Sequence, residues 1–288
     1  MIQNKKVLLL YSGGLDSRIV AKVLQEHNNK VEAIFFNHPF NSDESIRDNF
    51  LDKNNIALHE INCYEPPWLS RFLEMITTAE HGYGKGYNPC IDCKIFYKKV
   101  AQQYAQENDL DCLATGEVPG QRPMSQTEKA LTIMKKEISI QVAKPLADIG
   151  VTGRSRQKQI ELAKKYGIED YPSPAGGCLL ADTQLKKKFQ ALLENSLINP
   201  ETVSLLNIGR HFYFEQNKEW YVVGRNEEEC EVIDEYENVI ESGPGKPGVF
   251  YRAEKITDSV KQKALELQKA YKKHEDKQLY QKYQEWKL

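Results

Sequence analysis

The chain has 288 residues, which at about 150 residues per domain predicts two domains. Hydrophobic residues make up 40% of the sequence and aromatic residues 10%, so the chain can form packed cores and does not have the composition of a disordered protein. The formal net charge of −2 excludes a protein that binds nucleic acid through an overall basic charge.

Neither a secretion signal nor a membrane span is predicted. The apolar run Val7–Leu10 is shorter than the apolar region of about 7–15 residues in a signal peptide, and no stretch approaches the roughly 20 apolar residues that cross a membrane. We therefore expect a soluble, cytoplasmic protein with no membrane partner. In a reducing cytoplasm the six cysteines are not expected to form a disulfide framework, and paired cysteines there indicate metal or redox chemistry.

Strand and helix patterns alternate through the first part of the chain. Short apolar runs predict strands at Val7–Tyr11, Val31–Phe36, Ala57–Asn62 and Cys112–Thr115. Helical spacing predicts helices at Asp16–His27, Ser42–Asn54, Trp68–Glu80 and Cys90–Tyr104. The alternation indicates an α/β fold, a parallel sheet with helices on both faces. Because ligands of such sheets bind beyond the C-terminal ends of the strands, Ser12, Asn37 and Gly116 should converge on one crevice.

The pattern changes after about Pro200. His211–Phe214 and Trp220–Val223 predict two strands joined by the turn Glu215–Glu219, and Thr257–Leu288 has a polar, helix-favouring composition. We therefore expect a catalytic α/β domain at residues 1–190 and a small α+β domain at residues 191–288.

The hexapeptide Ser12-Gly13-Gly14-Leu15-Asp16-Ser17 lies between a predicted strand and a predicted helix. Two glycines let the backbone approach an oxyanion closely, and the N–H groups and dipole at the helix start favour negative charge. The Ser12 and Ser17 hydroxyls can add donors, and Asp16 can hold Mg²⁺ with bound phosphates. The spacing is neither that of the Walker loop nor that of the Rossmann fingerprint. The alternative is an ordinary strand–turn–helix corner in which Asp16 caps the helix.

Three cysteines are candidate ligands. Cys90 and Cys93 stand two residues apart at the start of a predicted helix, and Cys178 follows Gly176-Gly177. Such spacing suits one metal or cluster, and only three protein ligands would leave a coordination position open, as catalysis requires. Three interpretations stay open: a three-cysteine [4Fe–4S] cluster with one free iron, a persulfide or disulfide pair that carries sulfur, and zinc or structural cysteines. The helix N-terminus is expected to lower the pKa of Cys90.

The other three cysteines have no predicted role in chemistry. Cys63 and Cys112 fall in apolar, strand-like runs and are expected to be small buried hydrophobic residues. Cys230 lies in the acidic run Glu227–Glu231, where neighbouring carboxylates should raise its pKa.

The hexapeptide at residues 12–17 resembles the signature of the ATP pyrophosphatases of the PP-loop superfamily. Members of that superfamily cleave ATP to AMP and pyrophosphate while they adenylate a substrate oxygen. They include asparagine, NAD and argininosuccinate synthetases as well as tRNA thiolases. The resemblance implies a PP-loop, or adenine nucleotide alpha hydrolase-like, fold that binds ATP with Mg²⁺. The residues implied in ATP binding are Ser12, Gly13, Gly14, Asp16, Ser17, Phe36, Asn37, Thr115 and Gly116.

Further motifs narrow the acceptor. The segment Thr115–Thr127 resembles the Gly-Glu-x-x-Gly-Gln-x-x-Ser-Gln-Thr element of the tRNA 4-thiouridine synthetases, with an extra residue before Ser125. Lys144-Pro145-Leu146 resembles the next segment of that family, and Asn88-Pro89-Cys90-x-x-Cys93 is similar to an element of the tRNA 2-thiouridine enzymes. The resemblance covers roughly residues 5–185 and implies ATP-dependent thiolation of a tRNA uridine. Unlike the classical 4-thiouridine synthetases, the chain is expected to lack an N-terminal RNA-binding extension and a rhodanese-like domain.

The C-terminal part offers another RNA-binding module. Gly209–Phe212 and Val223–Glu229 resemble the RNA-binding domain of the NFACT family. The resemblance implies a surface that combines charge with aromatic faces for stacking unpaired bases. The residues implied are Arg210, His211, Phe212, Tyr213, Trp220, Tyr221 and Arg225. The alternative is a small β-domain whose aromatic residues form its core.

The predicted reaction is adenylation of a uridine carbonyl oxygen followed by replacement with sulfur. The predicted catalytic residues are Asp16, Cys90, Cys93 and Cys178, and the three cysteines are also the predicted metal ligands. Lys94, Lys144 and Arg122 are candidates for neutralising phosphate charge. Expected partners are tRNA and a sulfur donor, either sulfide or a cysteine desulfurase, and similar enzymes suggest a homodimer. Two rival functions remain: sulfur transfer or amide formation on a small molecule, and nucleotide sensing without catalysis.

Overall fold

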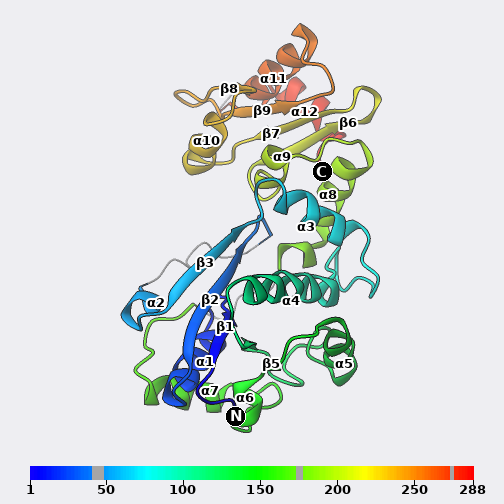
Figure 1. The fold of residues 1–288 in the computed structure, drawn as a ribbon. Helices are drawn as coiled ribbons and strands as arrows, with labels where there is room; N and C mark the ends of the chain where they lie inside the picture. The colour runs from blue at the N-terminus through cyan, green and yellow to red at the C-terminus, as the bar shows by residue number, and fades with distance from the viewer. Residues whose placement is uncertain (41–48, 173–177, 273–275) are drawn as a thin grey trace. The chain divides into compact units, whose positions relative to one another are not determined.

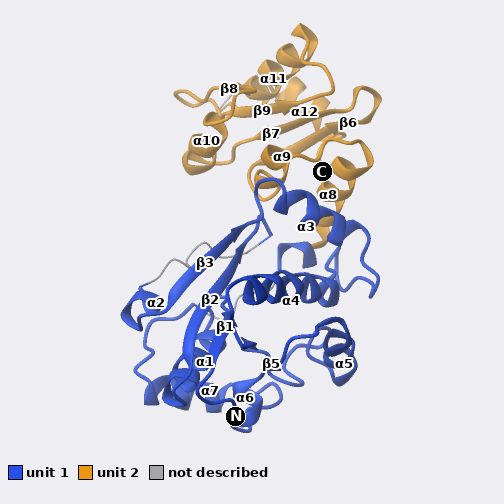
Figure 2. Cartoon of the chain, in the orientation of Figure 1, with its two compact units in different colours: residues 1–181 blue, residues 182–288 orange. Residues whose placement is uncertain are grey.

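The structure, a computed structural model, describes residues 1–40, 49–172, 178–272 and 276–288 (Figure 1). The chain divides into two units, Met1–Ala181 and Asp182–Leu288 (Figure 2). The division precedes the expected one at residues 190 and 191, because helix α8 (Thr183–Glu194) belongs to the second unit. There the Lys188 amine donates a hydrogen bond to the Leu206 carbonyl at 3.2 Å.

The first unit contains a five-stranded sheet in the order β3-β2-β1-β4-β5, and every neighbouring pair is parallel. The predicted α/β fold is therefore confirmed. The strands are β1 (Lys6–Leu10), β2 (Lys30–Asn37), β3 (Ala57–Asn62), β4 (Cys112–Thr115) and β5 (Val142–Ala143).

Helices cover this sheet from both sides. Figure 1 shows α4 on one side and α1 with α7 on the other. Val7, Leu8 and Leu9 of the central strand are fully buried, although successive side chains point to opposite faces. A continuous apolar strand of this kind is typical of a parallel sheet that has helices packed on both of its faces. The helices of this unit are α1 (Leu15–Glu26), α2 (Phe50–Lys53), α3 (Trp68–Thr77), α4 (Cys90–Glu107), α5 (Glu128–Glu137), α6 (Pro145–Asp148), α7 (Gln157–Lys165) and the 3₁₀ helix η1 (Leu179–Ala181).

Most predicted elements of this unit agree with the structure to within a few residues. The exception is the helix predicted at Ser42–Asn54, because residues 41–48 lie outside the described part and only α2 is seen beyond them. No helix among the described residues is long and apolar enough to cross a membrane.

The second unit contains an antiparallel sheet in the order β6-β7-β9-β8, which confirms a small α+β arrangement. The predicted hairpin pairs Phe212 with Tyr221 across its two strands. The strands are β6 (Arg210–Phe214), β7 (Glu219–Val223), β8 (Val239–Ile240) and β9 (Val249–Arg252). The helices are α8, α9 (Pro200–Ser204), the 3₁₀ helix η2 (Glu215–Asn217), α10 (Glu227–Asp234), α11 (Asp258–Ala270) and α12 (Lys277–Gln284).

Candidate functional site

A cavity of about 630 Å³ lies in the first unit, beside the C-terminal ends of β1, β2 and β4. Its volume falls within the range of roughly 300–1,000 Å³ that is usual for ligand pockets. Segments far apart in the sequence meet in its wall. The predicted site residues that line it are Ser12, Gly14, Asp16, Ser17, Phe36, Cys90, Cys93, Thr115, Gly116 and Cys178.

The loop between β1 and α1 presents backbone N–H groups to a ligand. Gly13 has a φ of 73°, a conformation that glycine adopts without a steric penalty. Gly14 precedes the first turn of α1, and no side chain caps that turn. The Ser17 hydroxyl donates to the Gly14 carbonyl at 2.8 Å, which holds the loop closed. The open N–H groups and the helix dipole together favour a phosphate at this point.

Gly116 allows the end of β4 to approach this loop. A Cβ atom at Gly116 would lie 3.1 Å from the Asp16 carbonyl carbon and from the Ser17 nitrogen. A side chain at this position would therefore crowd the backbone of the first turn of α1, so the close approach favours glycine.

Asp16 has an unpartnered oxygen. Its Oδ1 is buried and makes no hydrogen bond within the described residues. Burial raises the pKa of Asp16, and the nearby Arg156 guanidinium counteracts part of this rise. A buried carboxylate oxygen without a donor fits a hard cation such as Mg²⁺, which prefers oxygen ligands.

Two predicted nucleotide-binding residues do not line the cavity. Asn37 instead donates through its amide to Glu60 Oε1 at 2.8 Å. Neighbouring residues of a strand point to opposite faces, and of this pair Phe36 lines the cavity. Nucleotide binding by Asn37 stays a prediction. Gly13 shapes the turn, and its carbonyl accepts from Arg18 Nε at 2.8 Å.

The three candidate cysteines line the same cavity and influence one another. The nearby Cys178 and Cys90 thiols add to the effect of burial in raising the pKa of Cys93. Burial raises the pKa of Cys178 to about 11, with a further contribution from Cys90. Burial also raises the pKa of Cys90, although Lys94 opposes this. The expected lowering of the Cys90 pKa is therefore wrong, since loss of water outweighs the helix N-terminus.

The chemistry of the three thiols suits a soft metal, but the present distances between their sulfur atoms do not. Three sulfur donors facing one cavity match the preference of an iron–sulfur cluster for thiolates. Within the described ranges, however, no three His, Cys, Asp or Glu side chains are already spaced to hold a metal ion. A ligand or metal would therefore have to draw the sulfur atoms together.

The remaining cysteines are structural. Cys63 and Cys112 are 0% and 1% exposed, as predicted for small buried residues. Burial raises the pKa of Cys230, and its acidic neighbours add to this effect. The Cys230 sulfur accepts a hydrogen bond from the Gly248 N–H at 3.3 Å. This contact gives Cys230 a structural role within the second unit.

Backbone hydrogen bonds hold the segment that follows Cys178. The Leu179 N–H donates to the Phe40 carbonyl at 3.1 Å, and the Tyr87 N–H donates to the Leu180 carbonyl at 2.7 Å. These bonds fix the third thiol beside the other two. The preceding Gly176-Gly177 lies outside the described residues.

Gly86→Ala is expected to displace Cys178. Gly86 has a φ of 71°, and an added Cβ would lie 2.4 Å from the Leu180 carbonyl oxygen. Because that contact is with backbone, the segment must move. We expect faster alkylation of Cys178 by a thiol reagent, measured by mass spectrometry. Gly82→Ala is the matched control, since Gly82 has a φ of 76° but open space around its Cβ position. Equal labelling rates in the two variants would contradict the claim that backbone contacts near Gly86 hold Cys178 in place.

A buried carboxylate gathers three lysines next to the thiols. Both carboxylate oxygens of Glu117 accept hydrogen bonds from Lys98 Nζ, each at 2.9 Å. Glu117 also forms an ion pair with Lys94 Nζ at 3.1 Å. Lys144 lies 4.0 Å from the same carboxylate. The cluster carries two more positive charges than negative ones, which favours an anion in the adjoining cavity. Lys98 and Glu117 were not predicted as a pair, because α4 and β4 bring them together only in the folded unit.

Glu117→Gln is expected to destabilise the protein by about 3–5 kcal/mol near neutral pH, the usual effect of breaking a buried ion pair. Burial alone would raise the pKa of Glu117, but Lys94 and Lys98 lower it to about 2. A lowered folded-state pKa gives stability that is present above the usual value of 4.5 and is lost as pH falls toward 2. The difference between wild type and variant in denaturant unfolding should therefore shrink over that window.

Glu137→Gln is the control for this change, because Glu137 forms an exposed ion pair with Lys99 at 2.8 Å. It should alter stability little. Equal effects of the two substitutions at neutral pH would contradict a special contribution from the buried cluster.

Comparison with known proteins places the first unit in a family. A family profile described as "Thiamine biosynthesis protein (ThiI)" matches residues 2–184, which is more than half of the chain. The chain belongs to the ThiI family. The ThiI match covers all the cavity-lining segments and ends near the division between the two units.

Curated relatives of this ThiI-family chain are tRNA-modifying proteins by name. It is 26% identical to the tRNA-specific 2-thiouridylase MnmA of Buchnera aphidicola subsp. Acyrthosiphon pisum, over 78% of this chain and 71% of that protein. It is 31% identical to a probable tRNA sulfurtransferase of Alkaliphilus oremlandii, over 50% of this chain and 36% of that protein. Among these relatives the match spans from 34% to 71% of their length.

Two solved structures are similar to part of this ThiI-family chain. The U34-tRNA thiolase NcsA from Methanococcus maripaludis, solved with its [4Fe-4S] cluster, has 20% identity and a TM-score of 0.41, over 71% of this chain and 72% of that chain. A 4-thiouridine synthetase–RNA complex with bound ATP has 19% identity and a TM-score of 0.43, over 70% and 53%.

Three of the four aromatic residues predicted as stacking faces in the second unit are buried. Phe212, Trp220 and Tyr221 are each 0% exposed. Both faces of the β6–β7 hairpin are packed, so aromatic residues on either side of it belong to the core. Their prediction as exposed stacking faces is therefore wrong, and the alternative of a core role is correct for these three.

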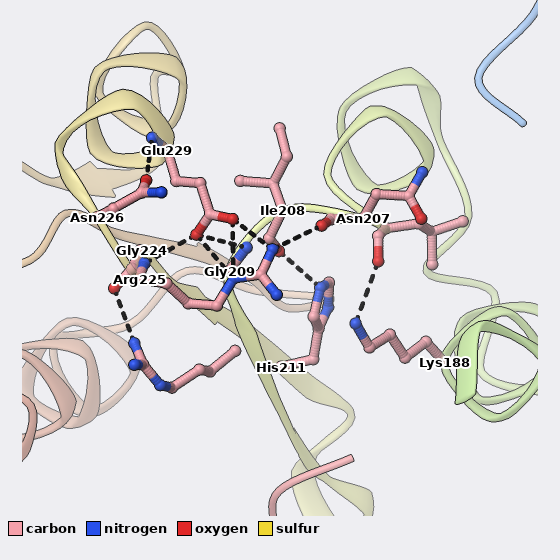
Figure 3. Close-up of polar contacts among 11 residues, drawn as sticks. Lys188, Asn207, Ile208, Gly209, His211, Gly224, Arg225, Asn226 and Glu229 are labelled. Carbon is pink, nitrogen blue, oxygen red and sulfur yellow. Dashed lines mark hydrogen bonds and ion pairs between the residues drawn. The ribbon is translucent and has the colours of Figure 1, made fainter. Parts of the chain in front are cut away.

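The cations beside this hairpin bind groups of their own unit (Figure 3). Arg225 Nε donates to Glu229 Oε1 at 2.8 Å, and the Glu229 carboxylate also accepts from the Gly209 N–H at 3.2 Å. Arg210 donates to the Gly224 carbonyl at 3.1 Å. His211 is buried, which lowers its pKa well below the usual value, so it is neutral. These contacts give the two Gly-Arg motifs a structural role at the start of β6 and directly after β7.

Proposed function

We propose that this protein uses ATP to adenylate a carbonyl oxygen of a tRNA uridine and then replaces that oxygen with sulfur. The observation that carries the proposal is that three cysteines line the same cavity as the loop Ser12–Ser17, which is called the phosphate loop below. The names of the curated relatives, a 2-thiouridylase and a probable tRNA sulfurtransferase, support the choice of tRNA.

ATP would bind with its phosphates at Ser12–Ser17 and its adenine near Phe36 and Gly116. The open N–H groups at the start of α1 would donate to the phosphates, and Asp16 would hold Mg²⁺ through its unpartnered oxygen. Mg²⁺ would supply charge neutralisation at the phosphates. Arg122 and Arg156 also line the cavity and add positive charge.

The first step forms an adenylate. The carbonyl oxygen of the base attacks the α-phosphorus, the bond from that phosphorus to the bridging oxygen breaks, and pyrophosphate leaves. In the second step sulfur attacks the activated ring carbon, the carbon–oxygen bond breaks, and AMP leaves. Adenylation is required because an oxo group is otherwise a poor leaving group. The base must leave its stack to enter the cavity, at about a few kcal/mol.

Cys90, Cys93 and Cys178 would hold a [4Fe–4S] cluster in this proposal. A cluster with only three protein ligands would supply an open iron that acts as a Lewis acid for sulfur. If no cluster is bound, one of these thiols would instead carry sulfur as a persulfide taken from a cysteine desulfurase, and a second thiol would release that sulfur to the ring carbon by forming a disulfide with the first. The sulfur donor would be sulfide for the cluster and a cysteine desulfurase for the persulfide.

RNA binding by the second unit and a homodimer that shares one tRNA are further parts of the proposal. They rest on sequence resemblance, since the aromatic residues expected to stack on bases are buried. Exposed basic side chains would then have to contact the phosphates.

The test is an anaerobic assay with purified protein, ATP and sulfide, with and without unmodified tRNA. We expect pyrophosphate release that depends on tRNA, together with a thiolated nucleoside found by mass spectrometry. About four irons per chain would support the cluster, and an iron-free protein that is active only when a cysteine desulfurase and cysteine replace sulfide would move sulfur onto a cysteine persulfide. The family name refers to thiamine biosynthesis, so sulfur transfer to a small molecule is the second candidate. Pyrophosphate release that ignores tRNA would favour it.

A further inference from the structure

His38 is a buried histidine that the proposed reaction leaves unused. It directly follows β2, at the same C-terminal ends of the strands as the loop Ser12–Ser17, and it lines the cavity. Its side chain belongs to a residue that is 8% exposed. A polar ring at this depth is stable only if its nitrogens find partners.

The hydrogen bonding of His38 fixes its tautomer. The Phe40 backbone N–H lies 3.2 Å from Nδ1. Because a backbone N–H can only donate, Nδ1 must accept, and the ring proton therefore sits on Nε2. Burial lowers the pKa of His38 to about 4, so the ring is neutral near pH 7. No other hydrogen bond of this ring occurs within the described residues, and Nε2–H is left as a donor for a ligand.

The surroundings of His38 place this donor on the sulfur side of the cavity. Its ring centroid lies 5.1 Å from that of Phe72 and 6.0 Å from that of Tyr97. Tyr97 in turn is next to Cys93 and Cys178, which both raise its pKa in addition to the effect of burial. The group of the base that sulfur replaces must also lie near these thiols.

We propose that His38 is a substrate-recognition residue whose Nε2–H donates a hydrogen bond to the carbonyl oxygen at position 4 of the target uracil. The inference rests on the proposed function and adds the feature that selects the base. Uracil presents a carbonyl acceptor where cytosine presents an amino donor. Two donors facing each other in a buried site leave both unpaired, so the neutral histidine rejects cytosine. The fixed tautomer is essential, because a ring that accepted at Nε2 would favour the opposite choice.

The test compares hexauridylate with hexacytidylate as fluorescent probes of the full-length protein, by anisotropy, with a non-hydrolysable ATP analogue present. Wild type should bind hexauridylate about tenfold more tightly, the order expected for one buried hydrogen bond. His38→Phe keeps a ring but lacks the donor and should lose the preference. His38→Gln keeps an N–H donor at a similar reach and should retain part of it. Thermal unfolding of each variant verifies that it is folded.

Other outcomes would overturn the inference. An unchanged preference in folded His38→Phe, or no preference in wild type, would show that His38 does not read the base. A tenfold loss of affinity for a fluorescent ATP analogue in His38→Phe, with the RNA preference kept, would assign the donor to the adenine instead. In each of these cases tRNA-dependent pyrophosphate release by wild type would still stand as support for the proposed function, so the two can fail separately.

Discussion

Asp16→Ala is expected to reduce tRNA-dependent pyrophosphate release by at least about a hundredfold, the effect typical of removing a group that stabilises charge in the transition state. Asp16 contributes the unpartnered buried oxygen of the phosphate loop, and its loss would remove the protein ligand for Mg²⁺. RNA affinity should stay nearly unchanged, since the carboxylate is not proposed to contact RNA. Steady-state pyrophosphate assays and filter binding would measure the two effects.

The control for this change is Asp52→Ala. Asp52 is an exposed carboxylate on α2 and does not line the cavity, so its loss should leave both measurements as in wild type. Full activity of Asp16→Ala would show that the phosphates bind elsewhere and that the loop has been assigned wrongly.

The second large effect is a separation of the two chemical steps. Single substitutions of the cavity cysteines by alanine should abolish formation of thiolated nucleoside, because no sulfur can be held near the adenylated carbon. Pyrophosphate release should continue, because the phosphate loop is intact. Mass spectrometry of digested tRNA and a pyrophosphate assay on the same reaction would show the separation. The three variants are Cys90→Ala, Cys93→Ala and Cys178→Ala.

Cys112→Ala is the control, because Cys112 is more deeply buried than the cavity cysteines but stands in β4 and does not line the cavity. It should keep both products and any bound iron. Normal thiolation by Cys178→Ala would exclude this thiol from sulfur transfer and leave the Cys90–Cys93 pair as the carrier.

The phosphate loop was predictable from the sequence because all its determinants are local. A buried strand, two glycines and an acidic residue at a helix start stand in six consecutive positions, and their geometry follows from backbone rules. The alternation of strands and helices likewise specifies a parallel sheet. Asn37 does not line the cavity beside Phe36, because a pattern locates the end of a strand more reliably than the face to which each side chain points.

Other parts of the site depend on packing that no local pattern contains. Lys98 and Glu117 stand on different elements, and only the packing of α4 beside β4 turns two ordinary charged residues into a buried pair. His38 gives no signal in sequence, since its tautomer depends on a hydrogen bond within a tight turn. The aromatic residues of β6 and β7 were misread because residues on both faces of a fully covered hairpin are buried, whatever motif they belong to.

The position of Cys178 near the end of the first unit has a consequence for biosynthesis. The ribosome releases the phosphate loop first and the Cys90–Cys93 pair next, but the third thiol emerges only when the unit is almost complete. Its place then depends on backbone contacts with Phe40 and Tyr87, which were synthesised long before. A nascent chain therefore displays two thiols without the third, and sulfur or iron that arrives during translation meets an incomplete set. In the proposed function, complete loading of the site would therefore follow the emergence and folding of the whole first unit.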